Sequence, residues 1–171
     1  MLIEARTTMS EPENRRRVIT GQSPDGKSVF THVEAIEPLR LGGDMLRHIV
    51  WGWDKTPALP YHEVGPYQAR ASFRELRAGG VQIETWVLPP HFPQQGGHEN
   101  ASRMHFYDTV DVVFILEGEI DLEQSGGAKV RLRRGDIVVQ NGTVHAWSNP
   151  TDERCVLGFV FCGADRDGAS S

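Results

Sequence analysis

The chain has 171 residues, of which 39% are hydrophobic and 24% are charged, and its formal net charge is -5. This composition is typical of one globular domain with a sizeable core. The negative charge and the lack of a basic stripe argue against a nucleic-acid partner, because few side chains would neutralise phosphates. No apolar stretch approaches the ~20 residues of a membrane-spanning helix, and the first residues lack the apolar core of a signal peptide.

Short extended segments separated by Gly, Pro and Asn turns run along the chain, and no long helix is expected. Apolar patterns predict strands at 17–20, 28–35, 44–53, 81–88, 105–118, 119–123, 129–132, 137–140, 145–149 and 154–161. Strands this short predict an all-β fold, an antiparallel jelly-roll β-barrel whose sheet is extended by the N-terminal strands. We expect a domain over 18–163, between a flexible N-terminus (1–17) and a flexible tail (164–171).

One predicted strand carries polar side chains whose burial would cost free energy unless they are paired. Alternate side chains of a strand share a face, so His105, Tyr107, Thr109 and Asp111 lie on the same side of segment 105–118. The second half of this segment is apolar and predicts burial. An imidazole, a phenol and a carboxylate buried together must bind each other, a metal or a ligand.

A second polar group follows the Asn141-Gly142 turn. His145, Trp147 and Asn149 share one face of the short strand 145–149. If this strand lies near 105–111, two imidazoles and one carboxylate meet. His105, Asp111 and His145 would then form a facial triad suited to iron, zinc, manganese or nickel. Asp111 alternatively orients an imidazole. Tyr107 is either a general acid or a buried phenol with one hydrogen bond.

These residues resemble the two motifs of the cupin superfamily, and most of the chain resembles its single-domain conserved-barrel (cupin-2 type) subgroup. The first motif falls on His105, Tyr107, Asp111 and Gly118, with Tyr107 in place of the usual second His and Asp111 in place of Glu. The second motif falls on Gly135, Asp136, Asn141, Gly142, His145 and Asn149. The resemblance implies the cupin-type jelly roll and a homodimer, to which the N-terminal strands with Trp51 and Trp53 would contribute. It leaves the reaction open, because cupins include oxygenases, decarboxylases, isomerases, lyases and binders.

The residue types favour an enzyme that acts on an aromatic or polyketide-like metabolite. Its catalytic residues would be His105, Tyr107, Asp111 and His145, with or without a divalent metal and with no organic cofactor. Trp86, Gln140 and Trp147 are expected to line the substrate pocket. The reaction would be lyase- or isomerase-like: dehydration, decarboxylation or a proton shift. The alternatives are an iron-dependent dioxygenase and a non-catalytic small-molecule binder.

The two cysteines indicate the redox environment that we expect for the chain. Cys155 and Cys162 are seven positions apart in one predicted strand, which places their side chains on opposite faces. A disulfide between them is not expected, and we predict free thiols in a reducing, cytoplasmic environment.

Overall fold

Extended segments dominate the computed structural model, which describes residues 15–42, 44–59, 73–93 and 104–166. Its strands are β1 (Arg15–Gln22), β2 (Ser28–Ile36), β3 (Leu39–Leu41), β4 (Met45–Trp53), β5 (Val81–Leu88), β6 (Thr109–Glu117), β7 (Glu119–Gln124), β8 (Lys129–Arg133), β9 (Ile137–Asn141), β10 (His145–Ser148) and β11 (Cys155–Gly163). One 3-10 helix, η1 (Phe73–Glu75), precedes β5. Among the described residues, no helix has both the length and the apolar character needed to cross a membrane.

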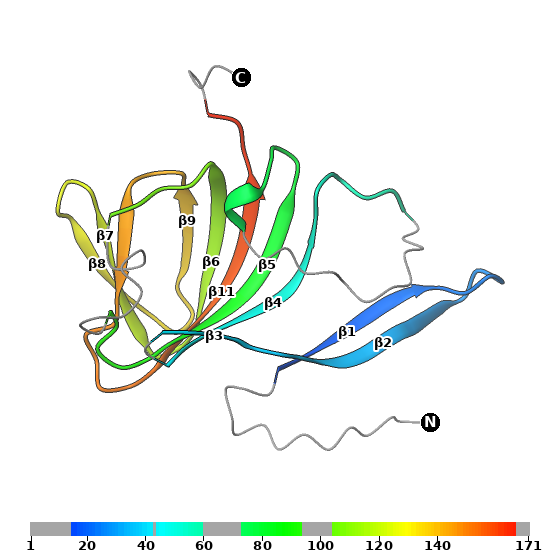
Figure 1. Ribbon diagram of the computed structural model, residues 1–171, viewed down its shortest axis with the longest axis horizontal. Coiled ribbons are helices and arrows are strands. Elements are labelled where there is room, and N and C mark those ends of the chain that lie inside the picture. The colour runs from blue at the N-terminus through cyan, green and yellow to red at the C-terminus, as the bar shows by residue number, and fades with distance from the viewer. Residues whose placement is uncertain (1–14, 43, 60–72, 94–103, 167–171) are drawn as a thin grey trace.

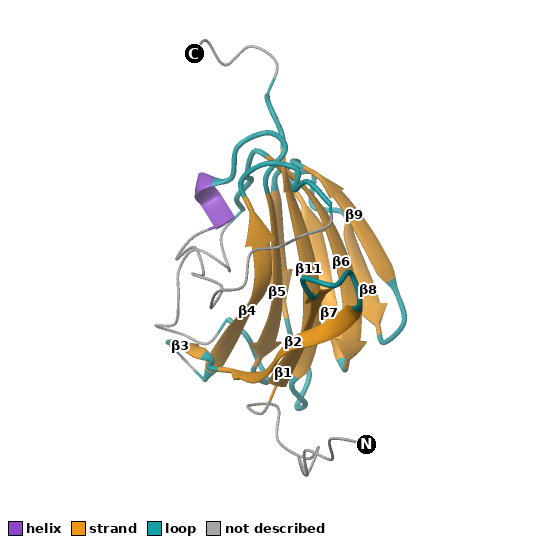
Figure 2. Ribbon diagram, turned by 90° about the vertical axis from the view of Figure 1, so that its right-hand side faces the viewer, coloured by secondary structure: helices purple, strands orange, loops and turns teal. Residues whose placement is uncertain are grey.

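The strands form two main antiparallel sheets, which confirms the all-β prediction (Figures 1 and 2). The larger sheet has the order β3-β4-β5-β11-β6-β9, and the smaller has the order β10-β7-β8. No ladder joins these two sheets among the described strands, so the jelly roll is a two-sheet arrangement rather than a continuously hydrogen-bonded barrel. Most of the core lies between the sheets, where Ile120 and Trp147 of the smaller sheet share one cluster with Phe159 and Phe161 of the larger.

The N-terminal strands extend the larger sheet only in part. β3 and β4 do so, whereas β1 and β2 pair with each other in a separate two-stranded sheet. The reason is the side-chain pattern: Met45 and Leu46 are both buried, so β4 offers apolar side chains to both faces of a sheet. Residues of β1 instead alternate between half-buried and exposed, as suits a strand with solvent on one side.

Alternation along β6 follows the prediction. Thr109, Asp111, Val113 and Ile115 are buried, and the residues between them are half-buried or exposed. We therefore call the side of the six-stranded sheet that carries Asp111 its inner face and the opposite side its outer face. The strand ends at Glu117, and the next residue, Gly118, has a φ of 70° that suits glycine and a position where any Cβ would clash with the Arg154 carbonyl. Cys155 and Cys162 are both free, as predicted.

Candidate functional site

The two histidines of the motifs lie side by side. His105 precedes β6 and forms an isolated antiparallel bridge with His145 of β10, in which each backbone N–H donates to the other's carbonyl over 2.9 Å. The ring centroids are 4.6 Å apart. The predicted meeting of two imidazoles is therefore present, although it comes from this bridge and not from one long strand, because Phe106–Asp108 lie outside β6.

His145 is held as a neutral imidazole with a defined tautomer. Its side chain is buried, and Nδ1 lies 2.8 Å from the carbonyl oxygen of Thr143. A carbonyl oxygen only accepts, so Nδ1 carries the proton and Nε2 keeps its lone pair. Burial lowers the pKa of His145 below its ordinary 6.5, and the neighbouring His105 lowers it further. Nε2 is thus able to accept a proton or bind a metal near neutral pH.

Tyr107 lies beside the histidine pair. Its ring centroid is 5.1 Å from that of His105 and 4.9 Å from that of Phe73, which it meets edge-on. Arg74 Nη2 donates a hydrogen bond of 3.1 Å to the phenol oxygen. Because guanidinium groups only donate, the phenol's own proton stays available for another acceptor.

Asp111 faces the interior from the middle of the sheet. It is 4% exposed and lies opposite Gln140 of β9 and Phe161 of β11. Its Oδ1 atom has no hydrogen-bond partner among the described residues. Burial raises the pKa of this carboxyl to about 6, and its interaction with the nearby Thr109 hydroxyl opposes the shift. Gln140 connects Asp111's row of the sheet to His145 through the Thr143 carbonyl oxygen, which accepts from Gln140 Nε2 at 3.0 Å and from His145 Nδ1 at 2.8 Å.

These residues do not assemble the predicted metal ligand set. In the part of the chain that the structure describes, no group of three or more His, Cys, Asp or Glu side chains is arranged to hold a metal ion. His105 and His145 are adjacent, but Asp111 does not complete a three-ligand group with them. The facial triad therefore does not fit the described geometry, and no chemical step below is assigned to a metal.

The three predicted pocket residues all face the interior. Trp147 is buried, with its ring centroid 6.1 Å from that of His145 and 6.3 Å from that of Phe159. Trp86 packs against Phe159 at 4.5 Å. Gln140 donates to the Thr143 carbonyl and hydroxyl oxygens, at 3.0 Å and 2.5 Å. The two tryptophans are thus part of an aromatic wall, and Gln140 hydrogen-bonds inside the fold.

Sequence reasoning missed a buried ionic cluster on the same inner face. Glu84 is fully buried, and its carboxylate accepts two hydrogen bonds of 2.5 Å from Arg47. Gln82 Nε2 donates to it over 2.5 Å, and Trp86 Nε1 over 2.6 Å. The available signal was the alternation of 81–88, which places both polar residues on the same face as Trp86.

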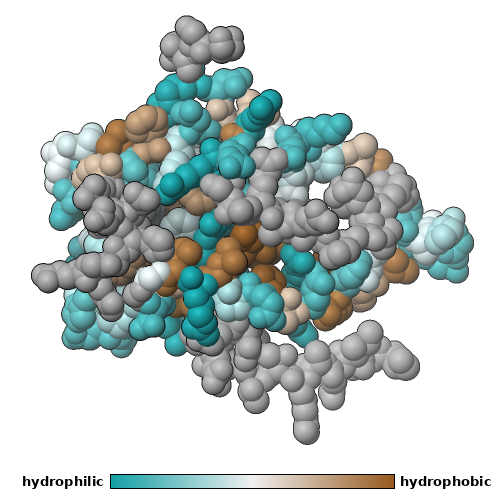
Figure 3. All heavy atoms as spheres, viewed as in Figure 1, coloured by the Kyte–Doolittle hydropathy of each residue, from teal (hydrophilic) through white to brown (hydrophobic). Residues whose placement is uncertain are grey.

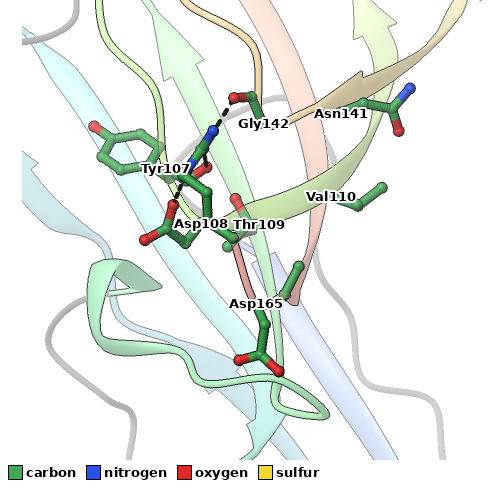
Figure 4. Close-up of a pocket in the computed structure, with 9 residues that line it drawn as sticks. Tyr107, Asp108, Thr109, Val110, Asn141, Gly142 and Asp165 are labelled. Carbon is green, nitrogen blue, oxygen red and sulfur yellow. Dashed lines mark hydrogen bonds and ion pairs between the residues drawn. The ribbon is translucent and has the colours of Figure 1, made fainter. Parts of the chain in front are cut away.

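A pocket of about 380 Å³ opens where β6 begins and β9 ends (Figure 4). It is lined by Tyr107, Asp108, Thr109, Val110, Asn141, Gly142, Ala164, Asp165 and Arg166. Arg166 bridges its two sides: it donates to the Asp108 carboxylate at 2.6 Å and to the carbonyls of Tyr107 and Gly142 at 3.2 and 3.1 Å. The pocket therefore lies beside Tyr107, at the edge of the sheet where β6 begins.

Comparisons with known proteins agree with the motifs. The Cupin_2 family model, described as the Cupin domain, matches residues 91–161. Phomopsin biosynthesis cluster protein D of Diaporthe leptostromiformis is 46% identical over 142 residues, which cover 81% of this chain and 73% of that protein. The cupin-domain-containing oxidoreductase virC of Hypocrea virens is 27% identical over 160 residues, covering 91% of this chain and 78% of that protein.

One similar solved structure is a Cupin 2 conserved barrel domain protein from Salinispora arenicola CNS-205. It is 18% identical, with a TM-score of 0.44, and the match covers 74% of this chain and 82% of that one. The family assignment rests on the domain match and on the fungal relative that is 46% identical. The chain therefore belongs to the cupin superfamily.

Proposed function

We propose that this cupin is an enzyme that moves protons on an aromatic or polyketide-like metabolite, in a lyase- or isomerase-like reaction. The observation that carries the proposal is the neutral His145, with Nδ1 held by the Thr143 carbonyl and its ring beside that of His105. A fixed neutral imidazole is a suitable general base near neutral pH. The name of one relative, phomopsin biosynthesis cluster protein D, supports a role in the transformation of a small metabolite.

His145 Nε2 would accept a proton from a carbon next to a carbonyl group. Tyr107, whose oxygen already accepts from Arg74, would donate its proton to the carbonyl oxygen or to a leaving hydroxyl. His105 would return the phenol's proton. Trp86 and Trp147 would position the ring of the metabolite. Loss of the protonated hydroxyl as water gives dehydration, after which the proton held by His145 passes through His105 to the Tyr107 phenolate. Return of that proton to another carbon, with the enol proton going back to Tyr107, gives isomerisation.

Proton abstraction can be tested before the natural substrate is known. The probe is ortho-hydroxyacetophenone in deuterated water, and the measurement is deuterium incorporation into its methyl group by NMR. We expect His145→Gln to reduce the exchange rate by about 10² to 10⁴-fold, the range usual for a positioned base. Since the pKa of His145 lies below 6.5, the wild-type rate should fall only below that pH. Unchanged exchange in the variant would contradict the assignment.

A second candidate is oxidation by an iron-dependent dioxygenase. It is favoured by the name of the similar protein virC, a cupin-domain-containing oxidoreductase. His105 and His145 would be two of the ligands, and a third would have to come from outside the described group. Iron near one equivalent in protein purified without chelators, together with oxygen consumption, would favour it over proton transfer. A compound that binds tightly and emerges unchanged would instead favour a non-catalytic binder.

We also propose that the chain forms a homodimer through the outer face of the six-stranded sheet. Apolar side chains of β6 and β9 on this face are 37% to 60% exposed: Phe114, Leu116, Ile137 and Val139. The β1–β2 hairpin projects from the body of the molecule (Figure 1), and brown apolar side chains are visible along it among polar ones (Figure 3). Its exposed apolar residues are Val18, Val29, Phe30 and Val33.

A second copy is the occupant that would cover both surfaces at once. A two-stranded hairpin is marginally stable alone, and a two-fold axis would place each hairpin against the partner's outer face. Trp51 and Trp53 lie on this face half-buried, and the Arg17 guanidinium lies 5.9 Å from the Trp51 ring centroid. Light scattering after gel filtration should show a dimer for the wild type and a monomer for Val139→Lys. A monomeric wild type would contradict the proposal.

A further inference from the structure

Three buried polar atoms on the inner face have no hydrogen-bond partner among the described residues. They are Gln82 Oε1, Thr109 Oγ1 and Asp111 Oδ1. The residues are 0%, 4% and 4% exposed, so water does not compensate freely. Native proteins satisfy nearly all such groups, and an exception points to a missing ligand or an ordered water. Three exceptions on one face of one sheet therefore need a common explanation.

The register of the sheet places these atoms around one aromatic side chain. Gln82 of β5 and Asp111 of β6 both lie opposite Phe161 of β11, one from each side. Their backbones are thus about 10 Å apart, two strand spacings. Thr109 lies two residues before Asp111 on the same face. The Phe73 ring stacks on Phe161 at 4.2 Å, so flat aromatic surfaces lie among the three atoms.

The chemistry of these atoms defines what they can bind. Gln82 Nε2 donates to Glu84, an acceptor, which fixes the amide so that its unpartnered atom is the carbonyl oxygen. The Asp111 atom is a carboxyl oxygen, and the Thr109 hydroxyl can accept as well as donate. The buried cation on this face, Arg47, is neutralised by Glu84 at 2.5 Å. Among the described residues, this row therefore offers hydrogen-bond acceptors, and its buried neighbour Arg47 is already paired.

We infer that Gln82, Thr109 and Asp111 bind the hydroxyl groups of the substrate, which is a neutral hydroxylated aromatic compound and not a carboxylic acid. The inference rests on the proposed function, because it names the substrate class of the same site. The inference also narrows the proposed substrate class, because an aromatic acid would place its carboxylate against the oxygen acceptors of these residues. Of the three residues, Thr109 also lines the pocket of about 380 Å³ at the end of the sheet (Figure 4).

Binding of two probes of nearly the same shape tests the inference. Ligand-observed NMR titrations compare para-hydroxybenzyl alcohol, which carries two hydroxyl donors, with para-hydroxybenzoate, which replaces one donor by a carboxylate. We expect the alcohol to bind the wild-type chain about 10-fold more tightly or better, because a buried carboxylate without a counter-charge is costly. Equal or tighter binding of the benzoate would overturn the inference.

Variants locate the binding. Thr109→Val and Gln82→Met should each weaken binding of the alcohol by roughly 3- to 10-fold, the value of one lost hydrogen bond. Thr85→Val is the matched control: its hydroxyl is also buried without a partner among the described residues, but it lies on the outer face next to Glu84 in β5. An equal loss in Thr85→Val and Thr109→Val would overturn the inference even if Gln82→Met does not fold.

The outcome can be separated from that of the proposed function. Binding of the alcohol with this variant pattern, but no deuterium exchange, would support the binding site and reject the proton-transfer enzyme. Turnover of a carboxylic acid that depends on His145 would support the proton-transfer enzyme and reject the inferred binding of a neutral hydroxylated compound.

Discussion

Two polar clusters share the inner face of the six-stranded sheet, and they differ in how far their hydrogen bonds are satisfied. Glu84 accepts from four donors on three residues: Arg47, Gln82 and Trp86. Asp111, two strands away, is also buried but leaves Oδ1 without a partner among the described residues. A saturated carboxylate has no capacity left for a ligand, whereas an unsaturated one retains it. The Glu84 cluster therefore has a structural role, whereas the Asp111 row can still form hydrogen bonds to a ligand.

The largest expected effect would come from breaking the saturated cluster. Glu84→Leu leaves the Arg47 guanidinium buried without its counter-charge, which should lower the free energy of unfolding by about 3 to 5 kcal/mol. The measurement is urea unfolding followed by circular dichroism. The double variant Arg47→Met with Glu84→Leu is the control and should recover most of the loss. A change below about 1 kcal/mol in the single variant would mean that the ion pair is not structurally important.

The unsaturated carboxylate should behave in the opposite way. Burial raises the pKa of Asp111 from 3.8 to about 6, so the folded chain binds this proton more tightly than the unfolded chain does. The free energy of unfolding contributed by this group therefore falls as pH rises from 3.8 through 6. The ionised carboxylate costs up to about 3 kcal/mol above that range, at about 1.4 kcal/mol for each tenfold change in proton affinity.

Asp111→Asn removes the ionisation and should stabilise the chain. We expect unfolding free energy to increase by up to about 3 kcal/mol at about pH 7, and the gain to vanish at about pH 4. Urea unfolding at the two pH values measures it, with Asp108→Asn, an exposed carboxylate, as control. Destabilisation at neutral pH would show that Asp111 has a partner in solution and would weaken the comparison.

The smallest expected effect on the free energy of unfolding comes from Arg166, which lines the pocket. Arg166→Gln removes an exposed ion pair with Asp108 and weakens contacts to the carbonyls of Tyr107 and Gly142. We expect a loss of only about 0.5 to 1 kcal/mol in unfolding free energy, because exposed pairs contribute little. Arg154→Gln, which removes a single exposed contact to Glu117, is the control and should change less. A loss of several kcal/mol would assign Arg166 a structural role comparable to that of Glu84.

Much of the site was predictable because strand alternation is a local property. The period of two placed Thr109 and Asp111 on one face, and His145 and Trp147 on one face, before any strand was paired. The predicted strands correspond to strands of the structure with small shifts at most of their ends, but β3 (Leu39–Leu41) was not predicted. The extent of the strand that begins with His105 was overestimated, because Phe106–Asp108 lie outside the ladder and His105 pairs with His145 in an isolated bridge.

The sequence by itself determined the family, the all-β class and the alternation that brings two imidazoles inward, since all of these follow from short-range patterns and motif spacing. Only the tertiary structure decided which face of β5 is buried, because apolar residues occupy one of its faces while Gln82, Glu84 and Trp86 occupy the other. It also decided that Arg47, 37 residues earlier, neutralises Glu84. Such pairings depend on sheet register between distant segments, which no local pattern specifies.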